Sequence, residues 1–157
     1  MSAGITHIGL AVPDLDQAID WYCKVFGFYI LAGPFDFNEA NEPTLNMTQD
    51  LQGAEVKKMR NVHLMERSGV GIELFEFQDP AFPDEKPAAH SGFFHICLIV
   101  DDIVESIEKI VQHGGRQRSK IWHINKGKPH YLVYAEDPFG HIIELYTRST
   151  AEIYGNK

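Results

Sequence analysis

The sequence predicts an α+β fold in which two βαβββ modules follow one another and form an open, eight-stranded, cup-shaped sheet with helices outside. Three observations lead to this prediction. Residues 6–28 recur as residues 94–116, both copies have the pattern of a strand followed by a helix, and both modules end on the tripeptide Ile-Glu-Leu. Neither module could bury its sheet alone, so we expect residues 1–157 to form one domain.

The repeat is visible when the two segments are aligned without a gap, with His95 lying 88 residues after His7. The identical columns fall on positions that define local structure. They are His7/His95, Ile8/Ile96, Leu10/Leu98, Val12/Val100, Asp14/Asp102, Ile19/Ile107 and Gly27/Gly115.

Each copy begins with an apolar strand that ends in Val-Pro-Asp or Val-Asp-Asp. Asp14 and Asp102 are placed to accept hydrogen bonds from the free amides at the start of a helix. Residues at helical spacing follow. They are Leu15, Ala18, Ile19, Tyr22, Val25 and Phe26 in the first copy, and Ile103, Ser106, Ile107, Ile110 and Val111 in the second. Gly27 and the pair Gly114-Gly115 then supply the left-handed residue that ends a helix.

The spacing of the tripeptides sets the module boundaries. Glu144 lies only 71 residues after Glu73, so module one is 17 residues longer than module two between its helix and its last strand. We assign module one to residues 4–77, with residues 33–60 as a long loop, and module two to residues 92–148. The proline-rich and charged residues 78–91 have the composition of a linker, and residues 149–157 form a C-terminal tail. The later strands of module two are expected at residues 120–123, 130–135 and 142–147.

Composition and charge limit the classes of function. The chain has 44% hydrophobic and 23% charged residues, as globular proteins do, and a formal net charge of −8 with a pI near 5.4. A phosphate backbone or an anionic membrane would be repelled, so no nucleic acid or membrane partner is expected. No apolar run reaches the roughly 18 residues needed to span a bilayer, which predicts a cytoplasmic protein. Two cysteines, Cys23 and Cys97, are too few for a disulfide framework.

Four polar residues lie in apolar strand segments. Glu73 and Glu144 are flanked by apolar residues, so alternation sends both carboxylates to the face away from the helices. His7 and His95 occupy matching positions in the first strand of each module. A lone strand histidine is more often a core residue than a ligand, but the repeat places the same two residue types at the same positions twice. Buried carboxylates need a partner, and mixed imidazole and carboxylate ligands suit one divalent ion of Zn, Ni, Co, Fe or Mn.

The sequence resembles a known superfamily over nearly its whole length. The matching residues are His7-Ile8-Gly9-Leu10-Ala11-Val12, Trp21-Tyr22, Phe26-Gly27-Phe28, His95-Ile96 and the run EDPFGHIIEL at residues 136–145. They are similar to the vicinal oxygen chelate superfamily, which includes glyoxalase I, methylmalonyl-CoA epimerase, extradiol dioxygenases, and fosfomycin and bleomycin resistance proteins.

The resemblance implies a metal site and a reaction type. It assigns His7, Glu73, His95 and Glu144 as metal ligands, and either Glu73 or Glu144 as the base that moves a proton beside a chelated carbonyl. It implies a lyase or isomerase of glyoxalase or epimerase type, acting on a small carbonyl or hydroxy-acid substrate, with a thiol adduct as one option. Family members commonly form homodimers. Lys126 resembles a glyoxalase loop lysine that meets an anionic part of the substrate.

Other readings stay open on the sequence alone. One alternative is a non-haem iron, extradiol-type dioxygenase, and another is a protein that sequesters a small molecule and so confers resistance. Phe75, Phe77 and Tyr146 share the inward faces of the glutamate strands and are expected to form an aromatic substrate lining. Six further residues could lie near the mouth of the site, although core or surface positions are expected more often for such residues: Arg60, His63, Trp122, His123, His130 and Tyr134.

Overall fold

The fold is α+β, as predicted, and is described by a computed structural model that covers residues 3–38, 42–81 and 92–155, with the backbone alone for residues 42–46. The chain divides into two compact units, Met1–Lys86 and Pro87–Lys157, and each unit has its own sheet. None of the helices in the described part of the chain has the length and apolar character needed to span a bilayer.

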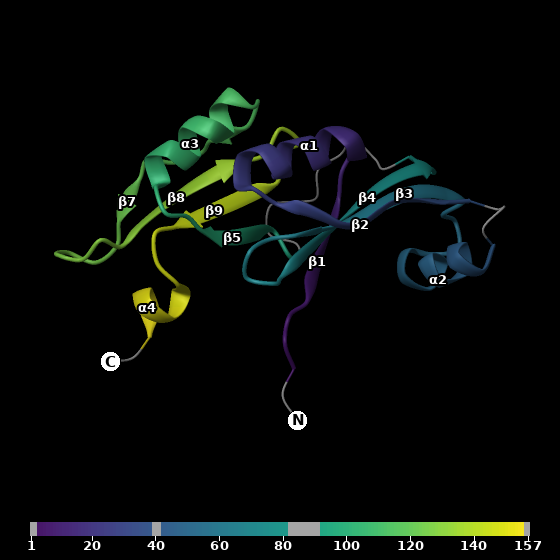
Figure 1. Cartoon of the computed structure of the whole chain (residues 1–157), viewed down its shortest axis with the longest axis horizontal. Coiled ribbons are helices and arrows are strands. Elements are labelled where there is room, and N and C mark those ends of the chain that lie inside the picture. The colour runs from purple at the N-terminus through teal and green to yellow at the C-terminus, as the bar shows by residue number, and fades with distance from the viewer. Residues whose placement is uncertain (1–2, 39–41, 82–91, 156–157) are drawn as a thin grey trace. The chain divides into compact units, whose positions relative to one another are not determined.

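The first unit contains a four-stranded sheet and two helices (Figure 1). Its elements are β1 (His7–Ala11), α1 (Leu15–Phe26), β2 (Tyr29–Phe37), α2 (Glu42–Gln52), β3 (Lys58–Met65) and β4 (Gly71–Asp79). The strand order is β1-β4-β3-β2. The first and last strands, β1 and β4, run parallel, whereas β2–β3 and β3–β4 are antiparallel pairs.

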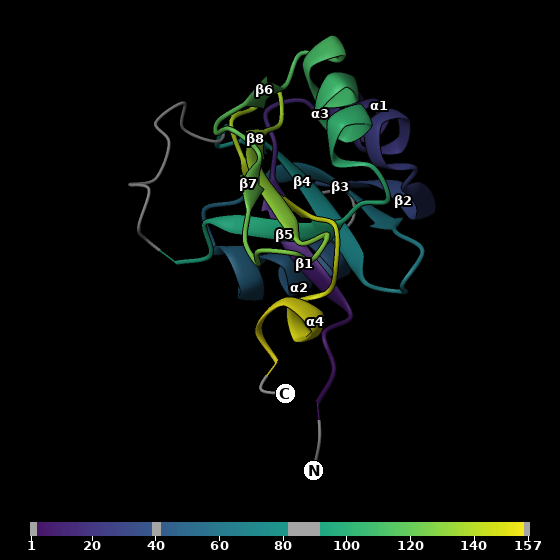
Figure 2. The ribbon, with the colours of Figure 1, turned by 90° about the vertical axis from the view of Figure 1, so that its left-hand side faces the viewer.

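The second unit repeats this topology with one additional short strand. Its elements are β5 (His95–Ile99), α3 (Ile103–Gln112), β6 (Arg116–Gln117), β7 (Trp122–His123), β8 (Tyr131–Glu136), β9 (Ile142–Tyr146) and α4 (Thr150–Tyr154). The order is β5-β9-β8-β6, again with a parallel first and last strand, and both β6 and β7 pair with β8 (Figure 2). The described residues thus hold nine strands where eight were predicted, because the single strand expected at 120–123 is preceded by the short strand β6.

The predicted helix ends are confirmed. The Asp14 side chain accepts a hydrogen bond from the Gln17 amide at 2.9 Å, and the Asp102 side chain accepts from the amides of Val104 and Glu105 at 2.9 and 3.0 Å. Gly27 ends α1 with φ 71°, and Gly114 follows α3 with φ 87°. These left-handed conformations are open to glycine without strain.

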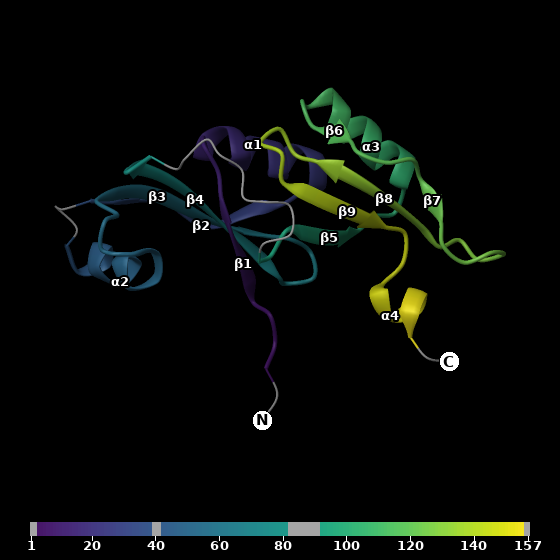
Figure 3. The same ribbon diagram turned by 180° about the vertical axis from the view of Figure 1, so that it is seen from behind.

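The helices α1 and α3 each pack on one face of the sheet in their own unit (Figures 1 and 3). The helix α1 packs against β3 and β4, and α3 packs against β6 and β8. The buried helix residues are Leu15, Ala18, Trp21, Tyr22 and Val25 in α1, and Ile103, Ile107 and Ile110 in α3. The facing strands bury Val62, Leu64, Ile72 and Leu74 in the first unit and Val133, Ala135, Ile143 and Leu145 in the second. Burying one such large side chain contributes about 1.5–3 kcal/mol.

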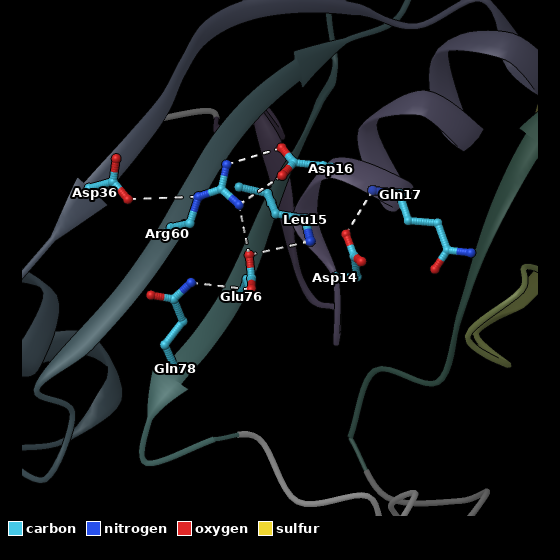
Figure 4. Close-up of polar contacts among 8 residues, drawn as sticks. All are labelled: Asp14, Leu15, Asp16, Gln17, Asp36, Arg60, Glu76 and Gln78. Atoms are coloured by element: carbon cyan, nitrogen blue, oxygen red, sulfur yellow. Dashed lines mark hydrogen bonds and ion pairs between the residues drawn. The ribbon is translucent and has the colours of Figure 1, made fainter.

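A polar cluster centred on Arg60 ties the start of α1 to the sheet (Figure 4). The Arg60 guanidinium, only 22% exposed, donates to both Asp16 oxygens at 3.0 and 3.1 Å and to Glu76 Oε2 at 3.2 Å. Glu76 Oε2 also accepts from the Leu15 amide at 3.4 Å, and Asp36 lies 3.7 Å from Arg60 Nε. Arg60 is therefore a structural residue on the helix-covered face, as its alternation with Val62 and Leu64 requires.

Two boundaries predicted from composition were wrong. The expected long loop at residues 33–60 contains the end of β2, the helix α2 and the start of β3. Polar composition concealed this structure, because only a few side chains anchor it: Phe37 and Met59 are opposite each other on β2 and β3 and are buried with Val56. The linker expected at 78–91 begins with the last residues of β4 and a bridge between Gln78 and Ala81, and its residues 82–91 lie outside the described part.

The expected tail at residues 149–157 also contains structure. It holds the helix α4, which begins with a capping box between Ser149 and Glu152 (Figure 3). The sequence Ser-x-x-Glu is a local start signal for a helix. Ile153 is buried in a cluster with Leu132 and Tyr146, so this short helix belongs to the core of the second unit.

Candidate functional site

Each unit brings one histidine and one glutamate together. His7 Nε2 lies 3.4 Å from Glu73 Oε2 in the first unit, and His95 Nε2 lies 3.4 Å from Glu144 Oε2 in the second. The parallel pairs β1–β4 and β5–β9 produce this arrangement, because their registers place each histidine two residues before the glutamate on the neighbouring strand. Side chains two positions apart share a face.

The glutamates lie on the face away from the helices, as alternation predicted. Their neighbours on the helix-covered face, Ile72 and Leu74 or Ile143 and Leu145, are buried. The Glu73 side chain is 14% exposed and the Glu144 side chain 9%. A carboxylate with so little water around it needs a cation or several donors nearby.

The two pairs fit the chemistry of a divalent cation. Histidine and carboxylate ligands bind Zn²⁺ at about 2.0–2.2 Å, so two ligands of one ion are about 3–3.5 Å apart. The observed 3.4 Å separations lie in this range. Within residues 3–38, 42–81 and 92–155, no set of three His, Cys, Asp or Glu side chains is arranged to hold a metal ion by itself. Each unit therefore supplies one pair.

Nitrogen donors surround Glu73. Asn61 Nδ2 donates to Glu73 Oε1 at 2.5 Å, and His63 Nε2 lies 3.4 Å from the same oxygen. The rings of His7 and His63 meet edge to face with centroids 5.9 Å apart. His63 is directly opposite Glu73 in the β3–β4 register, and Asn61 is buried. The Glu73 carboxylate is thus held in place by its own unit.

Oxygen and sulfur groups surround Glu144. Tyr134 is directly opposite Glu144 in the β8–β9 register, and both residues line the same pocket. Burial and the nearby Glu144 charge raise the pKa of Tyr134. Partial desolvation and Glu144 also raise the pKa of the Cys97 thiol to about 12, so Cys97 is a neutral neighbour of the carboxylate at physiological pH.

A pocket of about 370 Å³ adjoins the His95–Glu144 pair in the second unit. His95, Glu144, Tyr134, Arg118 and Ser119 provide its polar lining. Phe94 and Ile142 provide its apolar wall. A concave site with a few polar groups at an acid or base is typical of a small-molecule site.

The predicted lining residues lie elsewhere. Phe75 is on the same face as Glu73, but it is buried with Phe37, Val56 and Met59, and its ring stacks on Phe77 with centroids 6.2 Å apart. Tyr146 is buried on the Glu144 face, and its hydroxyl lies 3.2 Å from that of Tyr154. Lys126 is exposed and is not among the residues that line the pocket described above. Substrate contacts by Phe75, Tyr146 and Lys126 remain predictions.

The repeat contained a signal for two site residues that composition did not single out. His63 and Tyr134 are separated by the same 71 residues as Glu73 and Glu144. Each is paired with its glutamate across two antiparallel strands. Extending the repeat to the third strand of each module would have placed both beside a glutamate. Asn61 and Arg118 gave no such signal, because neither has a repeat mate of its own type.

The chain belongs to the Glyoxalase/Bleomycin resistance protein/Dioxygenase superfamily, whose family model matches residues 4–145. This is the vicinal oxygen chelate superfamily that the sequence resembles. The match spans both units and therefore both His–Glu pairs.

Several relatives are 27–29% identical to the chain over the aligned residues. A lactoylglutathione lyase of Escherichia coli O157:H7 is 29% identical over 147 residues, which cover 94% of this chain and 94% of that protein. A lactoylglutathione lyase of Schizosaccharomyces pombe is 27% identical, and the chain spans only 50% of its length. A mitochondrial methylmalonyl-CoA epimerase of Dictyostelium discoideum is 27% identical over 90% of this chain and 76% of that protein.

Solved structures agree on the fold. A glyoxalase family protein from Bacillus cereus superposes with a TM-score of 0.73 at 18% identity, covering 90% of this chain and 91% of that one. Glyoxalase I from Zea mays gives a TM-score of 0.63 at 24% identity, and the match covers 92% of this chain and 44% of the maize protein.

Proposed function

We propose that the protein is a metal-dependent lyase or isomerase that acts on a small carbonyl or hydroxy-acid substrate. The observation that carries this proposal is the pair of matching half-sites, each with a histidine nitrogen 3.4 Å from a glutamate oxygen on the same face of its sheet. A duplicated arrangement of poorly hydrated ligands is unusual for a purely structural role.

In this proposal His7, Glu73, His95 and Glu144 together hold one divalent cation. A bound cation would act as a Lewis acid toward two neighbouring oxygens of the substrate. Asn61 and His63 hold Glu73 in position for this task, and Tyr134 lies directly opposite Glu144. Residues that hydrogen-bond to metal ligands orient these ligands and influence the affinity of the site for the metal.

Glu144 is our candidate for the base that removes a proton from the carbon next to the carbonyl. Two observations favour it over Glu73. Glu144 lines the pocket in the second unit, whereas Glu73 Oε1 is engaged by the Asn61 amide at 2.5 Å. The proton taken up by the Glu144 carboxylate then returns to a neighbouring carbon. Inversion at the same carbon would instead need a second acid that donates a proton to the opposite face. A carboxylate within hydrogen-bond reach of the carbon acid suits the first outcome.

The names of the relatives support this class of substrate. Lactoylglutathione and methylmalonyl-CoA are both thioesters with a proton on the carbon next to the carbonyl, and both names are carried by relatives of this chain. We therefore include thiol adducts among the substrates of the proposed enzyme. A homodimer is part of the proposal as well, and analytical ultracentrifugation tests it.

Metal analysis is the first test. The purified protein should contain about one divalent ion per chain, and His7→Ala and His95→Ala should each lose most of it. His113→Ala is a matched control, because this exposed histidine at the C-cap of α3 belongs to neither pair. Unchanged metal content in His7→Ala would exclude His7 as a ligand and with it the proposed site.

Isotope exchange tests the reaction itself. Incubation of lactoylglutathione with the metal-loaded protein in D₂O should place deuterium on the carbon next to the carbonyl, and Glu144→Gln should abolish the exchange. The reaction should consume no oxygen. Oxygen uptake with a catechol after anaerobic loading with iron would instead identify a ring-opening dioxygenase.

A further inference from the structure

The pocket in the second unit combines the His95–Glu144 pair with a guanidinium group. Arg118 and Ser119 line this pocket together with Tyr134. Its volume of about 370 Å³ is near the lower end of the roughly 300–1,000 Å³ range of ligand sites. The pocket therefore suits a small molecule that reaches both the proposed metal pair and Arg118.

The charge around Arg118 is unbalanced. Its guanidinium forms an ion pair with Glu136, and the same Glu136 carboxylate accepts three hydrogen bonds from Arg116 at 2.7–3.1 Å. One carboxylate thus faces two guanidinium groups, which leaves one positive charge in excess. Arg116 is 67% exposed and is not a lining residue, whereas Arg118 is 42% exposed and lines the pocket. The excess positive charge of this cluster of Arg116, Arg118 and Glu136 lies beside the pocket, whose lining also contains the carboxylate of Glu144.

The backbone fixes Arg118 at the pocket. The Arg118 amide donates to the Tyr134 carbonyl at 2.8 Å, and the Ser119 amide donates to the same carbonyl at 3.2 Å. The Tyr134 amide in turn donates to Ser119 Oγ at 3.0 Å. The backbone of Arg118 is therefore held on Tyr134, the residue directly opposite Glu144 in the β8–β9 register.

We infer that the substrate carries an anionic oxygen group, a carboxylate or a phosphate, and that Arg118 binds it. The inference rests on the proposed function in one respect, namely that the vicinal oxygens of the substrate lie at the His95–Glu144 pair. An arginine fork matches the geometry of a carboxylate or phosphate and gives charge-assisted hydrogen bonds. The substrate class is then a small hydroxy- or keto-compound with an acidic group beyond its two neighbouring oxygens.

Binding of two matched probes tests this assignment. Dihydroxyacetone phosphate and dihydroxyacetone share the same vicinal carbonyl and hydroxyl oxygens, and only the first has an anionic group. Titration calorimetry of the protein as purified should show at least tenfold tighter binding of the phosphate. Arg118→Gln should weaken the binding of dihydroxyacetone phosphate about tenfold or more, and should change that of dihydroxyacetone less than twofold.

Arg116→Gln is the matched control. This substitution removes the same charge and also removes a partner of Glu136. Because the Arg116 side chain lies outside the pocket lining, the substitution should weaken the binding of dihydroxyacetone phosphate less than threefold. Equal losses in Arg116→Gln and Arg118→Gln would overturn the assignment, and so would equal affinity for the two probes. If Arg118→Gln fails to fold, Arg118→Lys keeps the charge without the fork and should give an intermediate loss.

The outcome separates this inference from the proposed function. A protein that retains metal and exchanges deuterium, but binds both probes alike, would keep the proposed function and lose the anion site. If the protein contains no metal, but Arg118→Gln still weakens phosphate binding more than Arg116→Gln does, the anion site would be kept and the proposed function would be lost. The ³¹P line width of the phosphate probe gives a second readout of binding that needs no turnover.

Discussion

His63 and Tyr134 occupy the same place in their two sheets, each directly across an antiparallel strand pair from a glutamate of the candidate site. In the first unit, Asn61 donates a hydrogen bond to the Glu73 carboxylate, next to His63. In the second unit, Glu144 and Tyr134 line a pocket. Duplication supplied the same framework twice, and the residues across from the glutamates made the halves different. The Glu73 carboxylate is held by Asn61 and His63, and the Glu144 carboxylate lines a pocket.

Tyr134→Phe should weaken metal retention or activity about tenfold, because it removes the hydroxyl of the residue directly opposite Glu144 while preserving the ring. Competition with a fluorescent chelator measures the metal affinity. Tyr131→Phe is the control, since the Tyr131 ring stacks on His123 on the neighbouring strand β7. An unchanged affinity and rate in Tyr134→Phe would show that the hydroxyl does not position the carboxylate.

Asn61→Ala should lower metal affinity about 10- to 100-fold, since it releases Glu73 Oε1 from its closest donor. The free energy of unfolding should fall as well, by about 1–3 kcal/mol, because a buried hydrogen bond and its packing are lost. Metal titration and urea denaturation of the same preparation separate these effects. Loss of stability at full metal affinity would assign Asn61 a role in folding alone.

Much of the fold could be predicted because the signals were local and occurred twice. Asp14, Asp102 and Gly27 determine helix ends through hydrogen bonds to nearby residues, and the structure confirms all three. The orientation of Glu73 and Glu144 followed from strand alternation alone. The His–Glu contacts were also within reach, since a shared face follows from position in the repeat.

The pH dependence of stability should show the ion pairs of Glu136. Burial alone would raise the pKa of Glu136, but hydrogen bonds and charges from Arg116 and Arg118 lower it overall from 4.5. A lowered folded-state pKa stabilises the fold above the unfolded value, and this contribution is lost as the pH falls through the folded pKa. The free energy of unfolding of the wild type should exceed that of Glu136→Gln by about 1–2 kcal/mol at pH 7, and this difference should become smaller as the pH is lowered below 4.5 to about pH 3. Urea denaturation at both pH values measures it, and a constant difference would contradict the assignment.

Arg60→Met should reduce stability by about 1–3 kcal/mol without changing metal content. The substitution leaves the Glu76 carboxylate, 17% exposed, without its guanidinium partner on the helix-covered face, away from Glu73. Asp36→Asn is the control, because Asp36 is an exposed and more distant partner whose loss should be worth less than about 0.5 kcal/mol. Loss of metal in Arg60→Met would show that the two faces are coupled.

The features that the sequence did not reveal depend on contacts between distant residues. Residues 33–60 have a polar composition, and both ends of the segment join the sheet through the pairing of residues 35–37 with residues 59–61. Phe37 and Met59 are buried there with Phe75. Arg118 has no motif of its own, and its place in the pocket follows from backbone hydrogen bonds to Tyr134. The composition of a segment indicates how much of it is exposed to solvent on average, but it does not indicate which strand the segment will pair with.

The parallel pairing of the first and last strands of each unit has a kinetic consequence. His7 comes next to Glu73, and His95 next to Glu144, only when the first and last strands of the unit pair, and these strands are separated in sequence by a helix and the other strands. Such long-range pairing forms late, because the chain must lose the entropy of a large loop first. A nascent chain that has not yet released the final strand of a unit from the ribosome would therefore have the histidine of that unit without its carboxylate partner.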